Sequence, residues 1–292
     1  MAQTHTLAVP GSVRPARTVG RRRLPIPARV AGIVVVLLVV VATLAPLLAP
    51  DDPVRGNLAD RLLPIGSPGH LLGTDGQGRD MLSRLIYGSR PSLLASLVPV
   101  FVAGLIGGVL GLVAGLAPGW PHAAVMRGLD VLYAFPAVLL AIAIAAALGS
   151  GVSNSIIALS VILIPPIARV TESETVRMRS ADFMEAARSS GAGWVAIALR
   201  QVVPNIAPAV VVYSTALIGL SIVYAAGLSY LGLGVSPPLA EWGVMVSDLQ
   251  KYLFTAPALL LVPAVAILVA SVAFNVLGDG LRDYFNVRTD VR

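Results

Sequence analysis

Charged residues are missing from five long stretches of the chain. No Asp, Glu, Lys or Arg lies between residues 29 and 51, 90 and 127, 130 and 169, 200 and 241, or 251 and 279. A helix needs about 20 apolar residues to cross the hydrocarbon core of a bilayer, and each stretch meets or exceeds that length. The pattern therefore predicts a membrane protein that crosses the bilayer several times.

The third charge-free stretch is too long for a single crossing. Residues 131–168 number 38, and one helix of that length would extend about 57 Å, against a hydrocarbon core of about 30 Å. The turn-forming residues inside it are clustered at positions 149–154, in Gly-Ser-Gly-Val-Ser-Asn, where we expect the chain to reverse. The sequence thus predicts an all-α protein with six transmembrane helices, at residues 30–48, 91–116, 131–148, 155–168, 206–230 and 257–277.

Basic residues are divided unequally between the two sides that six crossings define. With both termini in the cytoplasm, the inner segments hold 15 basic residues and the outer segments hold 6. Cytoplasmic loops carry the excess of Lys and Arg in membrane proteins, so the count predicts an N-in, C-in orientation. The first apolar run lacks a clear small-residue cleavage site before Asp51, and we interpret it as a retained anchor rather than a signal peptide.

This topology divides the chain into five parts. An Arg-rich cytoplasmic tail (1–29) precedes the first transmembrane helix (30–50) and an extracytoplasmic loop (51–90). A core of five transmembrane helices (91–277) includes a cytoplasmic loop at 169–205, and a second cytoplasmic tail (278–292) follows. The chain is thus predicted to be a multi-pass protein embedded in the lipid bilayer.

The composition disfavours several functional classes. Hydrophobic residues make up 56% of the chain and charged residues 12%, about half the charged fraction of a soluble domain. No cysteine is present for disulfides or thiolate metal sites. The only lysine, Lys251, lies in Leu-Gln-Lys-Tyr, so the Gly-Lys-Ser/Thr of a P-loop is absent. The basic residues behind the net charge of +6 lie in short segments that border the membrane spans, which disfavours a role in binding nucleic acid. We therefore expect no catalytic residue, metal or cofactor in this chain.

A polar island at residues 182–205 interrupts the hydrophobic runs. Asp182 with Glu185 three positions later is typical of a capped helix start, where negative charge is favourable. Gly191 suits a turn with positive φ at the helix end. A second short helix is expected at 194–202, ending before Pro204. The helical repeat predicts a shallow face that a partner could approach closely, formed by Phe183, Ala186, Ala187 and Ser190.

This island resembles a signature of permease subunits of bacterial ABC importers, E-A-A-x3-G-x9-I-x-L-P. Its matching residues are Glu185, Ala186, Ala187, Gly191 and Pro204, whereas Gln201 and Val203 replace the Ile and Leu of the pattern. In that family the segment is the cytoplasmic coupling helix, which docks in a groove of the ATPase subunit. The resemblance therefore implies an ATPase-coupling role for Asp182, Phe183, Glu185, Ala186, Ala187, Gly191 and Pro204.

The outer loop carries a second landmark, at residues 70–80. Its sequence, His-Leu-Leu-Gly-Thr-Asp-Gly-Gln-Gly-Arg-Asp, resembles the H-x-L-G-T-D-x-x-G-R-D segment of the C-type subunits of dipeptide, oligopeptide and nickel permeases. Asp75, Arg79 and Asp80 are expected to pair with one another or to contact a substrate-binding protein. A calcium site is disfavoured, because the ladder of oxygen ligands is incomplete and Arg79 intrudes.

A third landmark follows the fifth predicted span, at residues 231–243. Leu-Gly-Leu-Gly-Val-Ser-Pro-Pro and the later Glu-Trp-Gly also look like this branch. Pro237 and Pro238 stiffen the chain, and Trp242 suits a membrane interface. Two interpretations stay open at this point, a rigid loop with an aromatic anchor or an outer gate and docking rim.

Together these resemblances cover roughly residues 64–287 and imply an importer permease of type I fold in the bacterial inner membrane. Such a subunit forms half of a translocation pathway for dipeptides or oligopeptides, with nickel, glutathione or haem-type ligands as alternatives. The implied partners are a B-type permease, two ATP-binding subunits or one fused ATPase, and an extracytoplasmic substrate-binding protein. ATP and Mg would be bound by those partners.

Two rival classes follow from the same hydrophobic pattern. An ion-coupled secondary transporter is disfavoured because intramembrane charges, which mark ion pathways, are absent except for Asp130 near a span boundary. A simple channel would have no use for a coupling helix. Residues on the fifth span that could line a pathway or pack between helices are Ser214, Ser221, Tyr224 and Ser229, and packing is the favoured interpretation.

Overall fold

The computed structural model describes residues 24–286, whose regular structure is helical apart from two isolated β-bridges between positions 67 and 80. The long helices are α1 (Ile26–Thr43), α3 (Met81–Leu116), α6 (Val152–Arg179), α9 (Val203–Tyr230) and α11 (Pro257–Asn286). The shorter ones are α2 (Ala45–Leu48), η1 (Leu58–Asp60), α4 (Trp120–Tyr133), α5 (Ala137–Leu148), α7 (Asp182–Ser189), α8 (Trp194–Ile197), η2 (Ala198–Val202), α10 (Trp242–Leu249) and η3 (Gln250–Tyr252). Most of the predicted tail 1–29, and residues 287–292 of the predicted C-terminal tail, lie outside the described residues.

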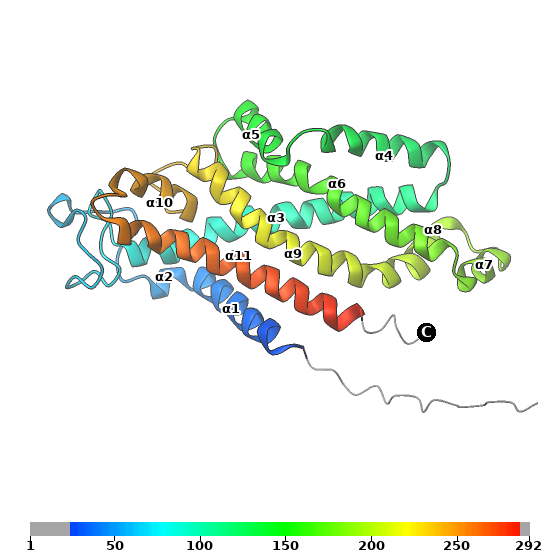
Figure 1. The fold of residues 1–292 in the computed structure, drawn as a ribbon, viewed down its shortest axis with the longest axis horizontal. Helices are drawn as coiled ribbons and strands as arrows, with labels where there is room; N and C mark the ends of the chain where they lie inside the picture. The colour runs from blue at the N-terminus through cyan, green and yellow to red at the C-terminus, as the bar shows by residue number, and fades with distance from the viewer. Residues whose placement is uncertain (1–23, 287–292) are drawn as a thin grey trace, which may run out of the picture.

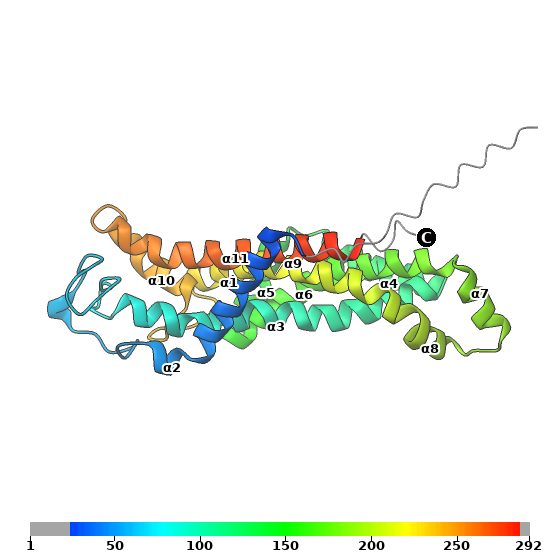
Figure 2. The same cartoon turned by 90° about the horizontal axis from the view of Figure 1, so that it is seen from below.

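The helices form an elongated bundle. α3, α6, α9 and α11 run side by side along its long axis, α1 lies against α11, and α4 and α5 lie over α6 (Figure 1). The loop before α3 and helix α10 form one end, and α7 and α8 form the other (Figure 2). The two loops that the charge count assigns to opposite sides of the membrane therefore lie at opposite ends of the bundle.

Five of the six predicted spans are long apolar helices in the described residues. The third is a bent pair, because α4 and α5 meet at an angle of 86°. Pro136 immediately precedes α5 and has no N–H to continue a helical ladder, which accounts for the break after Tyr133. Since α4 and α5 have 14 and 12 residues, each is too short to cross a core of about 30 Å alone.

Two helices extend well beyond the apolar runs that predicted them. α3 begins at Met81 rather than at 91, because Asp80 caps its first turn and accepts a hydrogen bond from the Ser83 N–H at 2.7 Å. α6 continues to Arg179, past the predicted end at 168. An uncharged run locates the part of a helix that suits lipid, whereas capping and packing decide where the helix ends.

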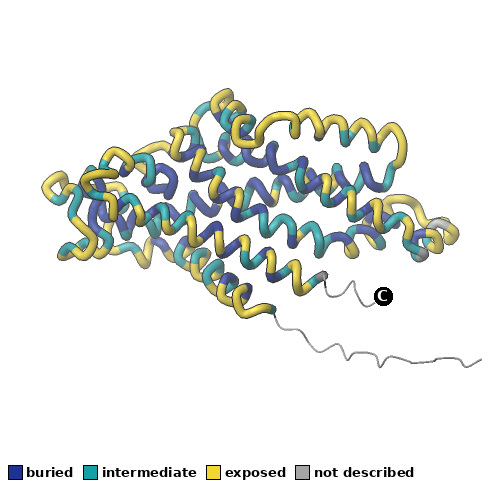
Figure 3. The backbone as a smooth tube through the Cα atoms, viewed as in Figure 1, coloured by how far each residue is buried: buried dark blue, intermediate teal, exposed yellow. Residues whose placement is uncertain are grey.

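The central contact of the bundle joins α3 to α6. Gly107, Gly111 and Gly115 repeat every fourth residue on α3, and a Cβ added at each would lie 2.3 to 2.8 Å from atoms of α6. For Gly111 the nearest atom is the backbone oxygen of Ala168, so the two backbones touch directly. Small residues at this spacing let membrane helices pack closely where hydrophobic burial gives no advantage over lipid. Figure 3 shows the buried residues along the middle of the bundle, with exposed residues along α1 and α4.

We expect Gly111→Leu to destabilise the protein by at least about 2 kcal/mol, because a side chain there would force the α3 and α6 backbones apart. Gly108→Leu is the matched control, since it lies on the same helix and a Cβ at Gly108 meets no atom within 4 Å. Thermal unfolding of both variants in detergent measures the effect. Equal melting temperatures would contradict the assigned contact.

Candidate coupling segment and outer cap

Residues 182–205, called the coupling segment below, lie at the end of the bundle formed by α7 and α8 (Figure 1). α7 begins at Asp182, as predicted, and the Ala181 carbonyl accepts a hydrogen bond from the Met184 N–H at 2.9 Å. Gly191 follows the helix with a φ of +77°, which confirms the predicted left-handed turn. The expected contribution of the Asp182 side chain to the helix start lies outside the described part of the chain.

The structure divides the face that the helical repeat predicted. Met184 is fully buried, and Phe183 and Ala187 are half-buried beside it, so these three point into the subunit. Glu185 and Ala186 are exposed, as are Ser189 and Ser190. The prediction that Phe183 and Ala187 share an open face with Ala186 is therefore wrong.

Met184 is the anchor that the sequence interpretation missed. It belongs to a cluster with Ile197, Val202 and Ile206, called the coupling cluster below. Leu112 and Leu116 of α3 and Met178 of α6 pack against this cluster. The apolar positions 183, 184 and 187 fall on one side of a helix, and this spacing was a readable signal for the buried side.

Pro204 does not end a helix, contrary to the prediction. The chain runs without a break from Trp194 to Tyr230, with a π-helical turn at Ala198–Val202. The Val203 N–H donates to the Ala198 carbonyl in this widened turn. Pro204 has no N–H to donate to Arg200, and a local π-turn is a common way for a helix to absorb such a loss.

The outer cap, defined here as residues 51–80 together with α10, is held by buried ion pairs. Arg79 Nε donates to Asp75 Oδ2 at 2.6 Å, and Arg84 Nε lies 3.3 Å from the same oxygen. Asp248 of α10 lies 3.3 Å from Arg79 and 3.5 Å from Arg84. Asp75, Arg79 and Arg84 are 1–2% exposed, so these side chains bind one another and present no charge to an outside partner.

Asp80 is equally buried, and its contacts give it a structural role. One carboxylate oxygen accepts from the Ser83 N–H, and the other lies 3.0 Å from His70 Nδ1. Asp75 also accepts hydrogen bonds from the N–H groups of Gln77 and Arg79. A guanidinium in direct contact with Asp75 occupies the place a calcium ion would need, which gives a geometric reason against the calcium interpretation.

Trp242 packs inside the subunit and is no membrane-interface anchor. It is 2% exposed, and its Nε1 donates to the Leu85 carbonyl of α3 at 3.0 Å. Glu241 beside it caps α10 through the Val244 N–H and accepts from the Ser92 hydroxyl at 2.8 Å. Burial raises the pKa of the Glu241 carboxyl. Pro237 and Pro238 are exposed and remain candidates for an outer rim.

The comparisons with known proteins agree with this architecture. A family described as "binding-protein-dependent transport system inner membrane component" matches residues 107–291, well over half of the chain. The chain belongs to this family of ABC importer permeases. The predicted family, helical fold class and multi-pass inner-membrane location are confirmed.

Two relatives and one solved structure show how far the likeness extends. The glutathione transport system permease protein GsiD of Escherichia coli O6:K15:H31 is 44% identical over 256 residues, covering 88% of this permease and 84% of the relative. GsiD of Pectobacterium atrosepticum is 42% identical over 253 residues, covering 87% and 84%. An inward-facing structure of the MetNI methionine ABC transporter matches with a TM-score of 0.59 and 20% identity, covering 70% of this permease and 97% of that chain.

The four fifth-span residues weighed as pathway lining fall into two groups. Ser221 and Ser229 are buried inside this permease, which agrees with a packing role. Tyr224 is half-buried and lines a cavity, and Ser214 is also half-buried. The sequence interpretation also missed Arg84 and Asp248, which pair with each other across 164 residues of the chain.

We expect Asp75→Asn to destabilise the permease by about 3–5 kcal/mol, because it removes one carboxylate from two buried guanidinium groups. Asp52→Asn is the control, since Asp52 pairs with Arg55 on the surface and its loss should change stability by less than about 0.5 kcal/mol. Thermal unfolding in detergent compares the two. Similar melting temperatures would contradict a stabilising ion network in the outer cap.

Proposed function

We propose that this permease forms one half of the membrane pathway of an importer for short peptides of the size of glutathione. The observation that carries the substrate class is the identity of 42–44% with two permeases named for glutathione transport, over 87–88% of the chain. The polytopic helical bundle with its apolar spans supports the transport role.

The proposed complex contains further subunits. They are a B-type permease, two ATP-binding subunits or one fused ATPase, and an extracytoplasmic substrate-binding protein. This chain lacks the P-loop lysine, so ATP and Mg would be bound by the ATPase subunits. The family description, which names a binding-protein-dependent system, supports the substrate-binding protein as a partner.

The proposed coupling route begins at the exposed side of α7. Glu185 and Ala186 face solvent there, and the small Ala186 side chain leaves room for an ATPase groove to approach. Met184, on the inner side, ties α7 to the coupling cluster, against which α3 and α6 also pack. A push on α7 would therefore act on several spans together, as a switch between inward-facing and outward-facing arrangements requires.

The direct test is reconstitution of this permease with its B-type partner, the ATPase subunits and the binding protein in liposomes. We expect uptake of labelled reduced glutathione that requires both ATP and the binding protein. Uptake by this chain alone, driven by an ion gradient, would overturn the proposal in favour of a secondary transporter. ATP-driven uptake of nickel or haem without uptake of glutathione or dipeptides would overturn the substrate class.

We expect Ala186→Trp to lower ATP-driven uptake at least about tenfold while the protein level stays normal, because the bulky side chain fills the space a docking partner needs. Ala124→Trp, an exposed alanine on α4, is the matched control and should keep normal uptake.

Ala187→Trp separates docking from folding. Ala187 packs against the coupling cluster, so this variant should lose folded protein as well as uptake. Normal uptake by Ala186→Trp would show that this side of α7 is not the docking face.

A further inference from the structure

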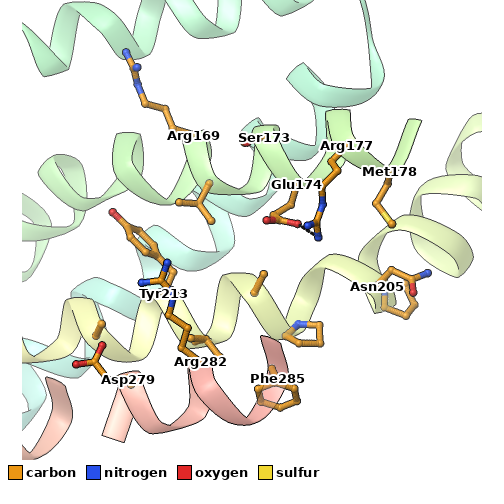
Figure 4. A pocket seen from close by; sticks show the side chains of 17 residues that line it. Arg169, Ser173, Glu174, Arg177, Met178, Asn205, Tyr213, Asp279, Arg282 and Phe285 are labelled. Carbon is orange, nitrogen blue, oxygen red and sulfur yellow. Dashed lines mark ion pairs between the residues drawn. The ribbon is translucent and has the colours of Figure 1, made fainter. Parts of the chain in front are cut away.

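One cavity in the described part of the permease lies between α6, α9 and α11, toward the end that carries the coupling segment. Its volume is about 1160 Å³ (Figure 4). Its lining includes five charged side chains, Arg169, Glu174 and Arg177 from α6 and Asp279 and Arg282 from α11. Glu174 and Arg177 form an ion pair at 2.6 Å, drawn as a dashed line in Figure 4.

A second cavity of about 330 Å³ lies between the α4–α5 pair, α6 and α9. Its lining is mostly apolar and aromatic, and it includes Tyr133 and Tyr224. Tyr213 is the one residue that lines both cavities. The two spaces therefore meet at Tyr213, a charged one toward the coupling segment and an apolar one deeper in the bundle.

The junction has a second wall on the opposite side. Arg169 lines the larger cavity, and its guanidinium stacks 4.9 Å from the ring centre of Tyr133, which lines the smaller one. Figure 4 shows Arg169 pointing toward α4, where it forms an ion pair with Asp130. This ion pair neutralises the charge of Arg169. Tyr213 is the side chain that borders both cavities.

The helical repeat shows that this arrangement is one continuous stripe on α9. Asn205, Ala209, Tyr213, Leu220 and Tyr224 follow one another at four or seven residues, and all line one cavity or the other. Val211 is 57% exposed and lies two positions from Tyr213, about 200° around the helix. Lipid or a partner helix can cover that opposite side, whereas the stripe faces α6.

Two features of the crevice suit a solute rather than lipid. The charged residues of its lining lie just beyond the predicted spans 155–168 and 257–277, on the side assigned to the cytoplasm, where water can reach them. Pro165 and Pro166 line the smaller cavity and have no N–H, which deprives the carbonyls of Val161 and Ile162 of their helical donors. Irregular backbone of this kind is tolerated where it borders a cavity that can supply other donors.

We propose that the α6–α9 crevice is this permease's half of the solute path, with Tyr213 as the constriction between its charged and apolar parts. The inference rests on the proposed transport function and deepens it. A charged part that holds both acidic and basic groups, next to an apolar part, suits a solute with charges of both signs and a less polar body, such as a short peptide with free termini. A lining of one sign would instead favour a simple ion.

Thiol labelling tests the proposal without knowing the substrate, because the chain has no cysteine. Single-cysteine variants of the assembled complex, in inside-out membrane vesicles without nucleotide, are treated with a trimethylammonium-ethyl methanethiosulfonate. We expect Ala209→Cys to react at least about tenfold faster than Val211→Cys, because only the first faces a water-filled crevice.

Two further comparisons test the constriction and the solute class. Tyr224→Cys should react slowly, and adding Tyr213→Ala should speed its reaction about tenfold by opening the junction. A sulfonatoethyl methanethiosulfonate, which is anionic, should react with Ala209→Cys within about threefold of the cationic reagent, because the lining carries charges of both signs and its third arginine, Arg169, is paired with Asp130.

The outcomes separate this inference from the proposed function. Equal labelling of Ala209→Cys and Val211→Cys, or no labelling of Ala209→Cys in the complex because a partner helix fills the crevice, would overturn the path while ATP-driven uptake stayed intact. If Tyr213→Ala left the labelling rate of Tyr224→Cys unchanged, Tyr213 would not be a constriction. Exclusion of either reagent by more than about a hundredfold would rule out a solute carrying both charges. If the complex showed the expected labelling pattern but did not take up glutathione, the proposed substrate would be rejected and the proposed solute path would stand.

Discussion

The direct contact between the backbones of α3 and α6 is the constraint on which the rest of this structure depends. α3 has 36 residues and extends about 54 Å, so it reaches from one end of the bundle to the other. Its glycines hold α6 along the inner half. Its first turns hold the outer cap through Asp80 and Arg84, and its last turns meet the coupling cluster through Leu112 and Leu116. A single helix therefore fixes the positions of both functional ends.

The two ends are fastened by different physical forces. The outer cap is held together, and tied to α3, by buried ion pairs and by the contacts of Glu241 and Trp242. Losing one partner of a buried ion pair leaves an uncompensated charge, so these contacts are strong only while every partner is present. The coupling segment is tied to the bundle by apolar packing around Met184, which is less dependent on geometry. The outer cap thus depends on ion pairing in a fixed geometry, whereas the coupling segment depends on apolar contacts.

The lining of the crevice between α6 and α9 changes from charged to apolar with distance from the coupling segment. Near the coupling segment the lining carries paired charges, and beyond Tyr213 it becomes apolar and aromatic. The prolines of α6 lie at this transition and weaken the helical ladder where a cavity lies beside it. In the proposed path, this lining would give weak, varied contacts, which would allow a solute to enter and also to leave.

The sequence by itself determined the membrane class, the six apolar runs, the helix start at Asp182 and the turn at Gly191, because these follow from hydropathy, capping and backbone freedom within short stretches. The spacing of Gly107, Gly111 and Gly115 was also readable, although the partner helix was not. Only the tertiary structure decided that Asp75 and Arg79 bind Arg84 and Asp248, that Trp242 is buried, and that Ala186 faces outward while Ala187 faces inward. Local sequence sets which conformations a segment prefers. Burial and pairing depend on which distant segments meet it, and that information is distributed over the whole fold.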